Sequence, residues 1–317
     1  MESLRNALST IAALPPVRVP SDFHGPRPPN VRALLKACVP PQMAAWSNPE
    51  RASAENQDWT EELNGIVTDG HAWYASCNAN DDREGVYKLT MSFDFVGKIE
   101  HPGDPDDVHI GALAVRDGQL FVPTQATPRR GVWIVGTDFV FSAPLFAEDP
   151  LPHDDPSDMD DLFAWCDVNP HNGLIYTSNF HEPKKLYAYE PVSNTLVRRE
   201  KQDIPLRQPS DGRPTTNVQG ACFTPNFKWI AVCDVDEDER IHLHSTLTGA
   251  FLDRRPQLAD TNDEAVGDRN ELEGIWFAPM ITGKGNHVQV HVLELNNDNH
   301  SPDDMYLWQF TVPLGAL

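Results

Sequence analysis

Short apolar runs separated by turn residues recur along this chain, a pattern that predicts β-strands rather than helices. Five segments share one order: a polar residue, a small-residue turn into an apolar run, a turn signal and a second apolar run. These segments begin at Glu62, His109, Leu162, Asn217 and Glu271, spaced by about 50 residues, as in known propeller repeats. The repeats predict an all-β fold, a β-propeller with five blades. Six blades are the alternative if residues 31–60 form a degenerate blade.

The first repeat predicts four strands, at residues 65–68, 72–76, 85–91 and 93–100. The last repeat predicts only three, at residues 274–277, 288–295 and 305–312. We expect an N-terminal strand at residues 43–46 to complete the last blade, because such a closure joins the ends of a ring and leaves no long open edge.

The region before the repeats has a different composition. A short amphipathic pattern at residues 4–14 ends at Pro15-Pro16, and many prolines follow without periodicity. Proline cannot continue a helix, so we expect an extended segment there. The predicted organisation is an N-terminal helix with a Pro-rich strap at residues 1–42, followed by a propeller domain at residues 43–317.

The net charge of the 317-residue chain is −22, which makes it an acidic protein and narrows its partners. Nucleic acid and anionic membranes would be repelled, so we expect a small-molecule substrate that is neutral or cationic. No apolar run has the length of a membrane span, and no signal peptide is evident, which favours a cytoplasmic location. The sequence does not indicate an oligomeric state. Dense acidic stretches at residues 148–161, 234–239 and 260–273 are expected to be solvated loops.

Several cysteine, tryptophan and histidine residues are assigned to structure rather than chemistry. The five cysteines form no C-x-x-C pair, and we expect buried free thiols. Tryptophans on the predicted strands are expected to pack between blades; they are Trp73, Trp133, Trp165, Trp229 and Trp276. Histidines that alternate along two strands are expected on a surface face; they are His242, His244, His287 and His291.

The candidate chemistry lies where the innermost strand of each blade begins. Aligning the repeats on their apolar runs places Glu62, His109, Asn217 and Glu271 at one level. Asn64, Gln219 and Glu273 lie two residues further along, beside Gly111 and Ala164 of the other two repeats. Because these positions converge on the axis of a propeller, their polar side chains are expected to lie close together.

Two interpretations of this set are open. Three carboxylates in a confined space repel one another, and a divalent cation would remove the repulsion. Oxygen ligands favour Ca²⁺ most, then Mg²⁺, whereas His109 would also accept Mn²⁺, Fe²⁺ or Zn²⁺. The predicted ligands are Glu62, Asn64, His109, Asn217, Gln219 and Glu271. In the other interpretation, these side chains cap strands and bind water without a metal.

The motifs Glu271-Leu-Glu-Gly-Ile275, Glu62-Leu-Asn-Gly-Ile66 and Asn217-Val-Gln-Gly-Ala221 resemble those of the calcium-dependent lactonase and gluconolactonase-like propellers. The resemblance implies a catalytic divalent ion and hydrolysis of a small ester or lactone. It departs from the family in showing five evident repeats rather than six, and a histidine at position 109. In this hypothesis Glu271, Glu273 and His109 are the catalytic residues, His109 serving as ligand or general base.

Other functions use the same residues. Axial carboxylates without metal are typical of glycosidases, and a biosynthetic cyclase or isomerase would need only one or two of them. A non-catalytic module that binds a ligand or a protein is a further alternative, because propellers serve many functions.

Overall fold

A computed structural model describes the chain between residues 50 and 313, with gaps. The described ranges are 50–54, 57–79, 82–101, 109–125, 130–147, 163–169, 171–209, 215–234, 240–255, 270–281, 287–296 and 302–313. All of them belong to one compact unit, Pro41–Leu317. The predicted strap at residues 1–42, the strand expected at 43–46 and most of the three acidic stretches lie outside the described residues.

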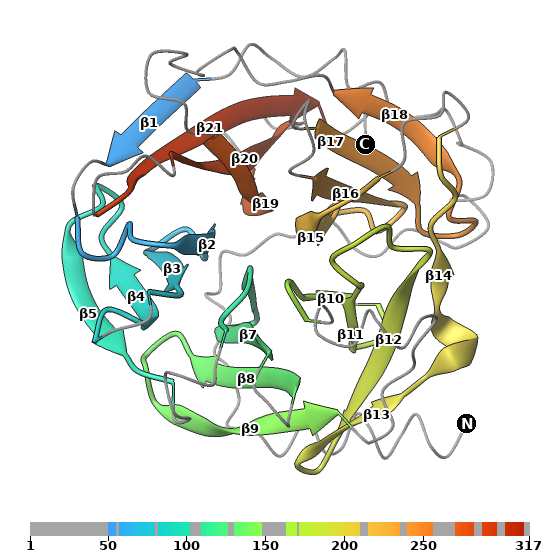
Figure 1. Cartoon of the computed structure of the whole chain (residues 1–317), viewed down its shortest axis with the longest axis horizontal. Coiled ribbons are helices and arrows are strands. Elements are labelled where there is room, and N and C mark those ends of the chain that lie inside the picture. The colour runs from blue at the N-terminus through green and yellow to red at the C-terminus, as the bar shows by residue number, and fades with distance from the viewer. Residues whose placement is uncertain are drawn as a thin grey trace. The chain divides into compact units, whose positions relative to one another are not determined.

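The described residues form an all-β structure (Figure 1). In chain order the first strands are β1 (Glu50–Ala54), β2 (Leu63–Thr68), β3 (Trp73–Cys77), β4 (Gly85–Leu89), β5 (Phe95–Ile99), β6 (Ala114–Arg116), β7 (Gln119–Gln125), β8 (Arg130–Gly136), β9 (Phe141–Ala147), β10 (Asp167–Asn169) and β11 (Leu174–Thr177). The others are β12 (Lys185–Val192), β13 (Thr195–Arg198), β14 (Ile204–Pro205), β15 (Val218–Phe223), β16 (Trp229–Asp234), β17 (Arg240–Ser245), β18 (Phe251–Arg255), β19 (Asn270–Ile281), β20 (His287–Asn296) and β21 (Asp304–Pro313). One short 3₁₀ turn, Glu200–Gln202, precedes β14. Among the described residues, no helix has the length and apolarity that a membrane crossing requires.

The strands pair in antiparallel groups of four that follow the chain. The orders are β2-β3-β4-β5, β6-β7-β8-β9, β10-β11-β12-β13, β15-β16-β17-β18 and β19-β20-β21-β1. The outer strands β9 and β13 also pair with each other in parallel, through Thr195 with Phe146 and Leu196 with Ala147. This pairing joins the eight strands of the second and third groups, and β14, which pairs with β12, makes the sheet nine-stranded.

The first strand of each group contacts the first strands of its two neighbours. β2 contacts β6, β6 contacts β10, β10 contacts β15, β15 contacts β19, and β19 contacts β2 again. Figure 1 shows β2, β10, β15 and β19 on the inner side, with β5, β9, β13, β18 and β1 on the outer side. The innermost strands therefore form a closed circuit, an arrangement consistent with a propeller.

The last group is completed by a strand from the N-terminal side, but that strand is not the expected one. β1 pairs with β21 from Glu50 opposite Gln309 to Ala54 opposite Met305, so it begins after the predicted segment at 43–46. Ala52 and Ala54 pack against the core, while the guanidinium of Arg51 lies 4.7 Å from the ring centre of Tyr306. Its inward side chains are small, so the alternation is weak and the sequence pattern did not indicate a strand there.

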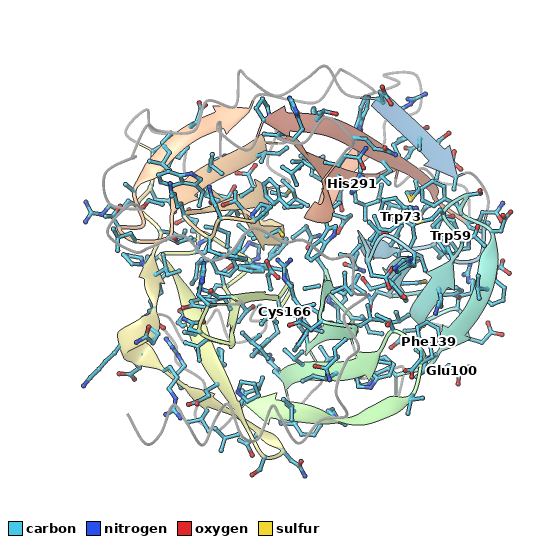
Figure 2. The ribbon with its side chains drawn as sticks, turned by 180° about the vertical axis from the view of Figure 1, so that it is seen from behind. Trp59, Trp73, Glu100, Phe139, Cys166 and His291 are labelled. Atoms are coloured by element: carbon cyan, nitrogen blue, oxygen red, sulfur yellow. The ribbon has the colours of Figure 1, made fainter. Side chains whose placement is uncertain are left out.

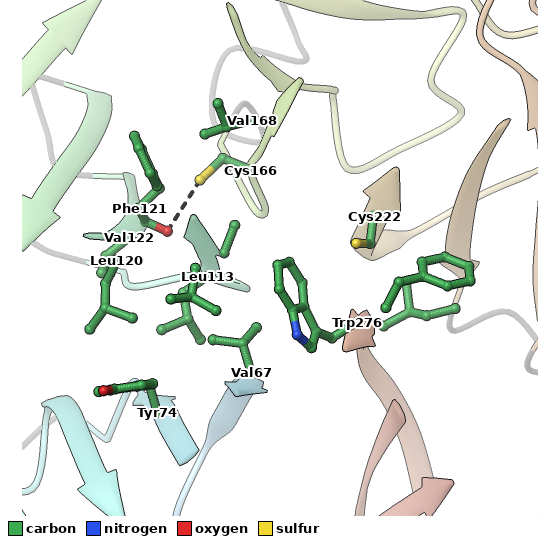
Figure 3. Close-up of a cluster of buried hydrophobic side chains, with 14 of the residues drawn as sticks. Val67, Tyr74, Leu113, Leu120, Phe121, Val122, Cys166, Val168, Cys222 and Trp276 are labelled. Carbon is green, nitrogen blue, oxygen red and sulfur yellow. Dashed lines mark hydrogen bonds between the residues drawn. The ribbon is translucent and has the colours of Figure 1, made fainter. Parts of the chain in front are cut away.

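The core between the innermost strands is apolar. Figure 3 shows Trp276 of β19 together with Val67, Leu113 and Cys222, which come from other strands and segments. All four are buried in one cluster, and the Trp276 indole donates a hydrogen bond to the Thr68 carbonyl across to β2 (3.2 Å). Dispersion and burial of these side chains hold the neighbouring groups together.

Aromatic side chains fill the space between groups, as predicted for the tryptophans. The five tryptophans of the predicted strands are all buried. Figure 2 shows Trp59, Trp73 and His291 near one another. The Trp73 ring of β3 packs edge-on against His291 of β20, with 4.9 Å between ring centres.

The prediction that the alternating histidines lie on a surface is wrong for three of them. His242, His244 and His291 are buried, whereas His287 is half-buried. Alternation showed that these residues share a face of their strand, but it did not show which face is covered. The rings of His242 and His244 both pack against Phe251 of β18. The prediction of buried thiols outside disulfides is confirmed for Cys77, Cys166, Cys222 and Cys233.

Candidate functional site

Three of the innermost strands begin with the same local geometry. In each, the ladder to the second strand skips one residue: Asn64 in β2, Gln219 in β15 and Glu273 in β19. A bulge of this kind leaves the extra residue unpaired and redirects its side chain. The repeat alignment therefore put structurally equivalent residues together at these three positions.

A glycine follows each bulged residue, and it permits the strands to approach closely. A Cβ atom on Gly220 would lie 2.7 Å from the Gly274 Cα, and one on Gly65 would lie 2.8 Å from the Ala112 Cα. Real Cβ atoms do not tolerate such contacts with backbone. The Asn-Gly, Gln-Gly and Glu-Gly pairs of the repeats thus bring the beginnings of β15, β19 and β2 together.

This approach crowds three glutamates, which we call the carboxyl cluster: Glu62, Glu271 and Glu273. Their depth is graded, since Glu62 is exposed, Glu271 is half-buried and Glu273 is only 3% exposed. Glu62 has a positive φ of 46°, and its backbone N–H donates to Asp303 (3.0 Å). The cluster therefore reaches from solvent to the interior along two neighbouring strands.

Two members of the carboxyl cluster, Glu273 and Glu62, have a pKa above that of an ordinary glutamate. The pKa of Glu273 lies well above its usual range because burial disfavours the charge, because Glu271 repels it and accepts a hydrogen bond from it, and because Glu62 repels it. Partial burial of its carboxyl group, then repulsion by Glu61 and Glu271, likewise raises the pKa of Glu62, although the residue as a whole is exposed. Glu273 is thus held as a carboxylic acid beside other carboxyl groups.

Amide side chains of β2 and β15 lie beside the carboxyl cluster, but they carry no positive charge that would neutralise it. The Gln219 amide donates to Glu273 Oε1 at 3.4 Å, while the second oxygen of Glu273 is buried without a hydrogen-bond partner in the described structure. The Asn64 amide donates to the Glu62 carbonyl at 2.9 Å. An unsatisfied buried oxygen is costly, so Glu273 Oε2 marks a position at which a donor is missing.

His109 and Asn217 are engaged elsewhere. His109 Nδ1 lies 2.8 Å from Gln125 Oε1, and burial lowers the pKa of His109 while Gln125 partly offsets the change. Asn217 Oδ1 lies 2.6 Å from His181 Nδ1, which belongs to the neighbouring group. Among the contacts of the described residues, neither His109 nor Asn217 touches a glutamate of the cluster. The structure therefore brings together Glu62, Glu271, Glu273 and Gln219, with Asn64 beside them.

Two other inner strands, β6 and β10, carry a second set of charged side chains, and these are paired with each other. Arg116 of β6 contacts both oxygens of Asp167 of β10, at 3.2 and 3.1 Å, and its guanidinium lies 4.5 Å from the ring centre of Trp276. Asp167 also accepts backbone hydrogen bonds from Val168 (2.7 Å) and Phe223 (2.8 Å). Burial opposes the charge of Arg116, but Asp167 outweighs it and raises the pKa of Arg116.

A third buried polar group was missed by the sequence interpretation. His242 of β17 lies between Thr215 and Asp234, with Nδ1 2.7 Å from the Thr215 hydroxyl and Nε2 3.1 Å from Asp234 Oδ2. All three residues have no exposed surface. The spacing of these residues along the chain gives no signal, because the contacts join different strands and a loop. Their complete burial favours a structural role.

Among the described residues, no group of three or more histidine, cysteine, aspartate or glutamate side chains is placed to hold a metal ion. The predicted ligand set also contains the amides Asn64, Asn217 and Gln219, and it stays a prediction. Glu273 and Glu271 hydrogen-bond to each other, and the nitrogen of Gln219 rather than its oxygen points to Glu273.

Comparisons with known proteins assign neither a family nor a function to the chain. No protein-family model matches the chain, and no curated protein matches it. A solved structure of a protein from Lactobacillus plantarum, a structural genomics target, is similar at 14% sequence identity and a TM-score of 0.39. The match covers 79% of this chain and 71% of that one. So distant a similarity carries no conclusion about function, and the resemblance to the lactonase-like family stays a prediction.

Proposed function

We propose that the chain is a five-bladed β-propeller that hydrolyses a small ester or lactone at the carboxyl cluster. The circuit of β2, β6, β10, β15 and β19, each beginning a group of four strands, supports the blade number. The pair of Glu271 and Glu273 carries the functional proposal, because it combines a protonated acid with a neighbouring carboxyl group that is open to solvent. Enzymes obtain an acid and a base from two like groups by such differences in environment.

The pair can perform both proton transfers of ester hydrolysis. Glu271 as a carboxylate takes a proton from water as the water oxygen bonds to the carbonyl carbon. Glu273 as a carboxylic acid gives its proton to the leaving oxygen as the bond between that oxygen and the carbonyl carbon breaks. The products are a carboxylic acid and an alcohol, and the pair retains one proton throughout. Proton exchange between Glu271 and Glu273 then restores the starting state.

The test is hydrolysis of a panel of small esters, lactones and aryl glycosides by the wild type and by Glu271→Gln. We expect turnover of one substrate class and a loss of about 100-fold or more in the variant. Glu190→Gln, in a partly exposed ion pair with Arg199 on the outer strands β12 and β13, is the matched control and should keep full activity. Turnover that is equal in wild type and Glu271→Gln contradicts the proposal.

The same assay decides between metal-free chemistry and the metal-dependent hydrolase. We expect activity to survive chelator and to gain nothing from added Ca²⁺. Loss in chelator with recovery on Ca²⁺ contradicts the metal-free mechanism and supports a cation at the carboxyl cluster. Because the reaction needs Glu273 protonated, activity should fall as pH rises through the raised pKa of Glu273.

A further inference from the structure

The outer strand of the first group, β5, differs from the other four outer strands in how its edge is protected. β9 and β13 pair with each other. β1 and β18 each end their sheet, but charged residues fill two of the five positions of β1 and three of the five positions of β18. Charge on an edge strand opposes pairing with another chain. β5 also ends its sheet, and Lys98 is its one charged residue.

The charge of Lys98 is directed back toward its own sheet. Its ammonium donates a hydrogen bond to the Asp82 carbonyl and lies 5.8 Å from the ring centre of Tyr87 on the neighbouring strand β4. The side chain of Lys98 is only 15% exposed. Lys98 therefore does not present a charge to a strand that approaches β5 from outside.

Two successive apolar side chains of β5 are exposed instead, Phe95 by 60% and Val96 by 55%. Regular alternation would cover one of them, but the ladder to β4 pairs Leu89 with Phe95 and Lys88 with Gly97, which leaves Val96 as an unpaired bulge residue. A bulge redirects a side chain. Among the described residues, a Cβ atom on Gly97 would meet no atom within 4 Å other than those of its chain neighbours. The apolar stretch is therefore uncovered.

Hydrogen bonds hold this stretch in a fixed conformation. The Thr90 backbone N–H donates to the Asp94 carbonyl at 2.8 Å, and the Asp94 N–H donates to the Thr90 hydroxyl at 3.1 Å. The Phe95 ring packs edge-on against Tyr87 of β4, with 6.1 Å between ring centres. An edge that is already ordered loses little conformational entropy when a partner binds.

The charges at the two ends of β5 select the kind of partner. Asp94 precedes the strand and Glu100 follows it, and both residues are exposed. A second copy of this chain that paired antiparallel about Gly97 would place Asp94 opposite Glu100 at both ends. Like charges opposite each other destabilise a strand pair, and each copy carries a net charge of −22. A strand with basic residues at its ends would meet opposite charges instead.

We infer that β5 is a docking edge for an extended segment of a partner protein, apolar in its middle and basic at both ends. The segment adds to the sheet as a further strand, a known mode of peptide recognition. Its apolar side chains cover Phe95 and Val96, and its basic ends meet Asp94 and Glu100. β5 lies on the outer side of the structure (Figure 1), so this inference is independent of the proposed hydrolysis.

The test is binding of capped peptides to the full chain, measured by calorimetry and by amide chemical shifts. The probe is the peptide Lys-Val-Thr-Val-Thr-Val-Lys, and its control has glutamate in place of both lysines. We expect the lysine peptide to bind about tenfold or more tightly, because its ends meet acidic residues. The amide shifts should change along β5. Equal binding of the two peptides overturns the inference, as do shift changes that leave β5 unaffected.

Methylated peptides test whether the peptide pairs as a strand. Methyl groups on alternate backbone nitrogens block one edge of an extended peptide and leave its other edge free. We expect one phase of methylation to weaken binding by about tenfold and the other phase to change it little, since a single edge pairs with β5. Equal effects of the two phases overturn the inference.

A variant then places the peptide on β5. Val96→Lys puts a charge on the apolar edge and should weaken binding of the lysine peptide by about tenfold. Val140→Lys is the matched control, because Val140 is a valine with 67% exposure just before β9 of the neighbouring group, and it should leave binding unchanged. Equal binding by the wild type and Val96→Lys overturns the inference. The comparison of peptides on the wild type keeps the test valid even if a variant does not fold.

Sedimentation of the chain without peptide tests the other occupant, a second copy. We expect the wild type and Val96→Lys to sediment alike, because repulsion between the acidic ends opposes pairing of two β5 strands. A wild-type dimer that Val96→Lys dissociates overturns the inference, since a second copy then occupies the edge.

Discussion

Two sets of charged or acidic side chains lie on different inner strands, one on β6 and β10 and the other at β2 and β19, and their surroundings differ. Asp167 has Arg116 as a partner and two backbone donors besides. Glu273 has other glutamates as neighbours and keeps one oxygen unsatisfied. Both aspartate and glutamate are buried, so burial alone does not distinguish them. The difference teaches that a buried carboxylate with a cationic partner is a structural charge, whereas a buried carboxyl group without one stays protonated and is a candidate for function.

The largest effect is expected from breaking the compensated set. Asp167→Ala leaves the guanidinium of Arg116 buried without its partner, which should lower the free energy of unfolding by about 3 to 5 kcal/mol. Denaturant unfolding measures this change. The control is Glu190→Ala in the more exposed pair with Arg199, where we expect a loss below about 1 kcal/mol. Equal losses of unfolding free energy in Asp167→Ala and Glu190→Ala would contradict the distinction between the buried and the more exposed ion pair.

The close approach of the strands at the carboxyl cluster can be tested by substituting the glycines that follow the bulged residues. Gly220→Ala places a Cβ 2.7 Å from the Gly274 Cα and 2.9 Å from the Glu273 carbonyl oxygen, so the backbones of β15 and β19 must separate. We expect a loss of about 1 to 3 kcal/mol in the free energy of unfolding. Gly274→Ala is the matched control, because its nearest contact would be an ordinary 3.6 Å. A thermal melt in which the control is the more damaged variant contradicts the close approach.

Glu273→Gln should stabilise the protein, the reverse of Asp167→Asn. The folded state holds the proton of Glu273 at a pKa above that of the unfolded chain, so wild-type stability is lost as pH rises above about 4.5 toward the folded pKa. Glutamine mimics the protonated acid and does not titrate. The advantage of the variant should be small at pH 4.5 and grow as the pH rises toward 8. Thermal melts of the wild type and the variant between pH 4.5 and 8 measure this difference. A variant that is less stable than the wild type at every pH contradicts the assignment of a raised pKa to Glu273.

The smallest effect on stability is expected from His244. Its imidazole is buried without a partner of opposite charge and is neutral. Burial first, and then His242, lowers the pKa of His244 to about 4, against a partial increase from the Gly249 backbone. The unfolded chain takes up the proton below about pH 6.5, so stability should fall between pH 7 and 5.5 by about 1 kcal/mol. His244→Leu should flatten this slope. His71→Gln, at an exposed position, should not change it.

The sequence predicted the parts of this comparison that depend on local pattern. Asn64, Gln219 and Glu273 were found because each precedes a glycine at an equivalent point of a repeat, and the close approach of the strands requires the glycine at positions 65 and 220. Their convergence follows from the repetition itself. The acidic members of the cluster could therefore be predicted from the order of residues alone.

The parts that depend on partners from other strands were not predicted. His109 and Asn217 occupy the right level, but Gln125 and His181 engage them, and neither partner belongs to the repeat pattern. Arg116 and Asp167 lie in different groups of strands, and no motif links them. The buried histidines were assigned to the wrong face because alternation carries no information about what covers a strand.

The parallel pairing of β9 with β13 ties two neighbouring groups of strands together at their outer edge. Thr195 and Leu196 are hydrogen-bonded across the outer rim to Phe146 and Ala147, and among the described strands no other outer pair is joined in this way. Separation of neighbouring groups at the other outer rims would break no such ladder among the described strands. The strands β2 and β19, beside which the carboxyl cluster lies, start two groups whose outer strands, β5 and β1, have no such pairing.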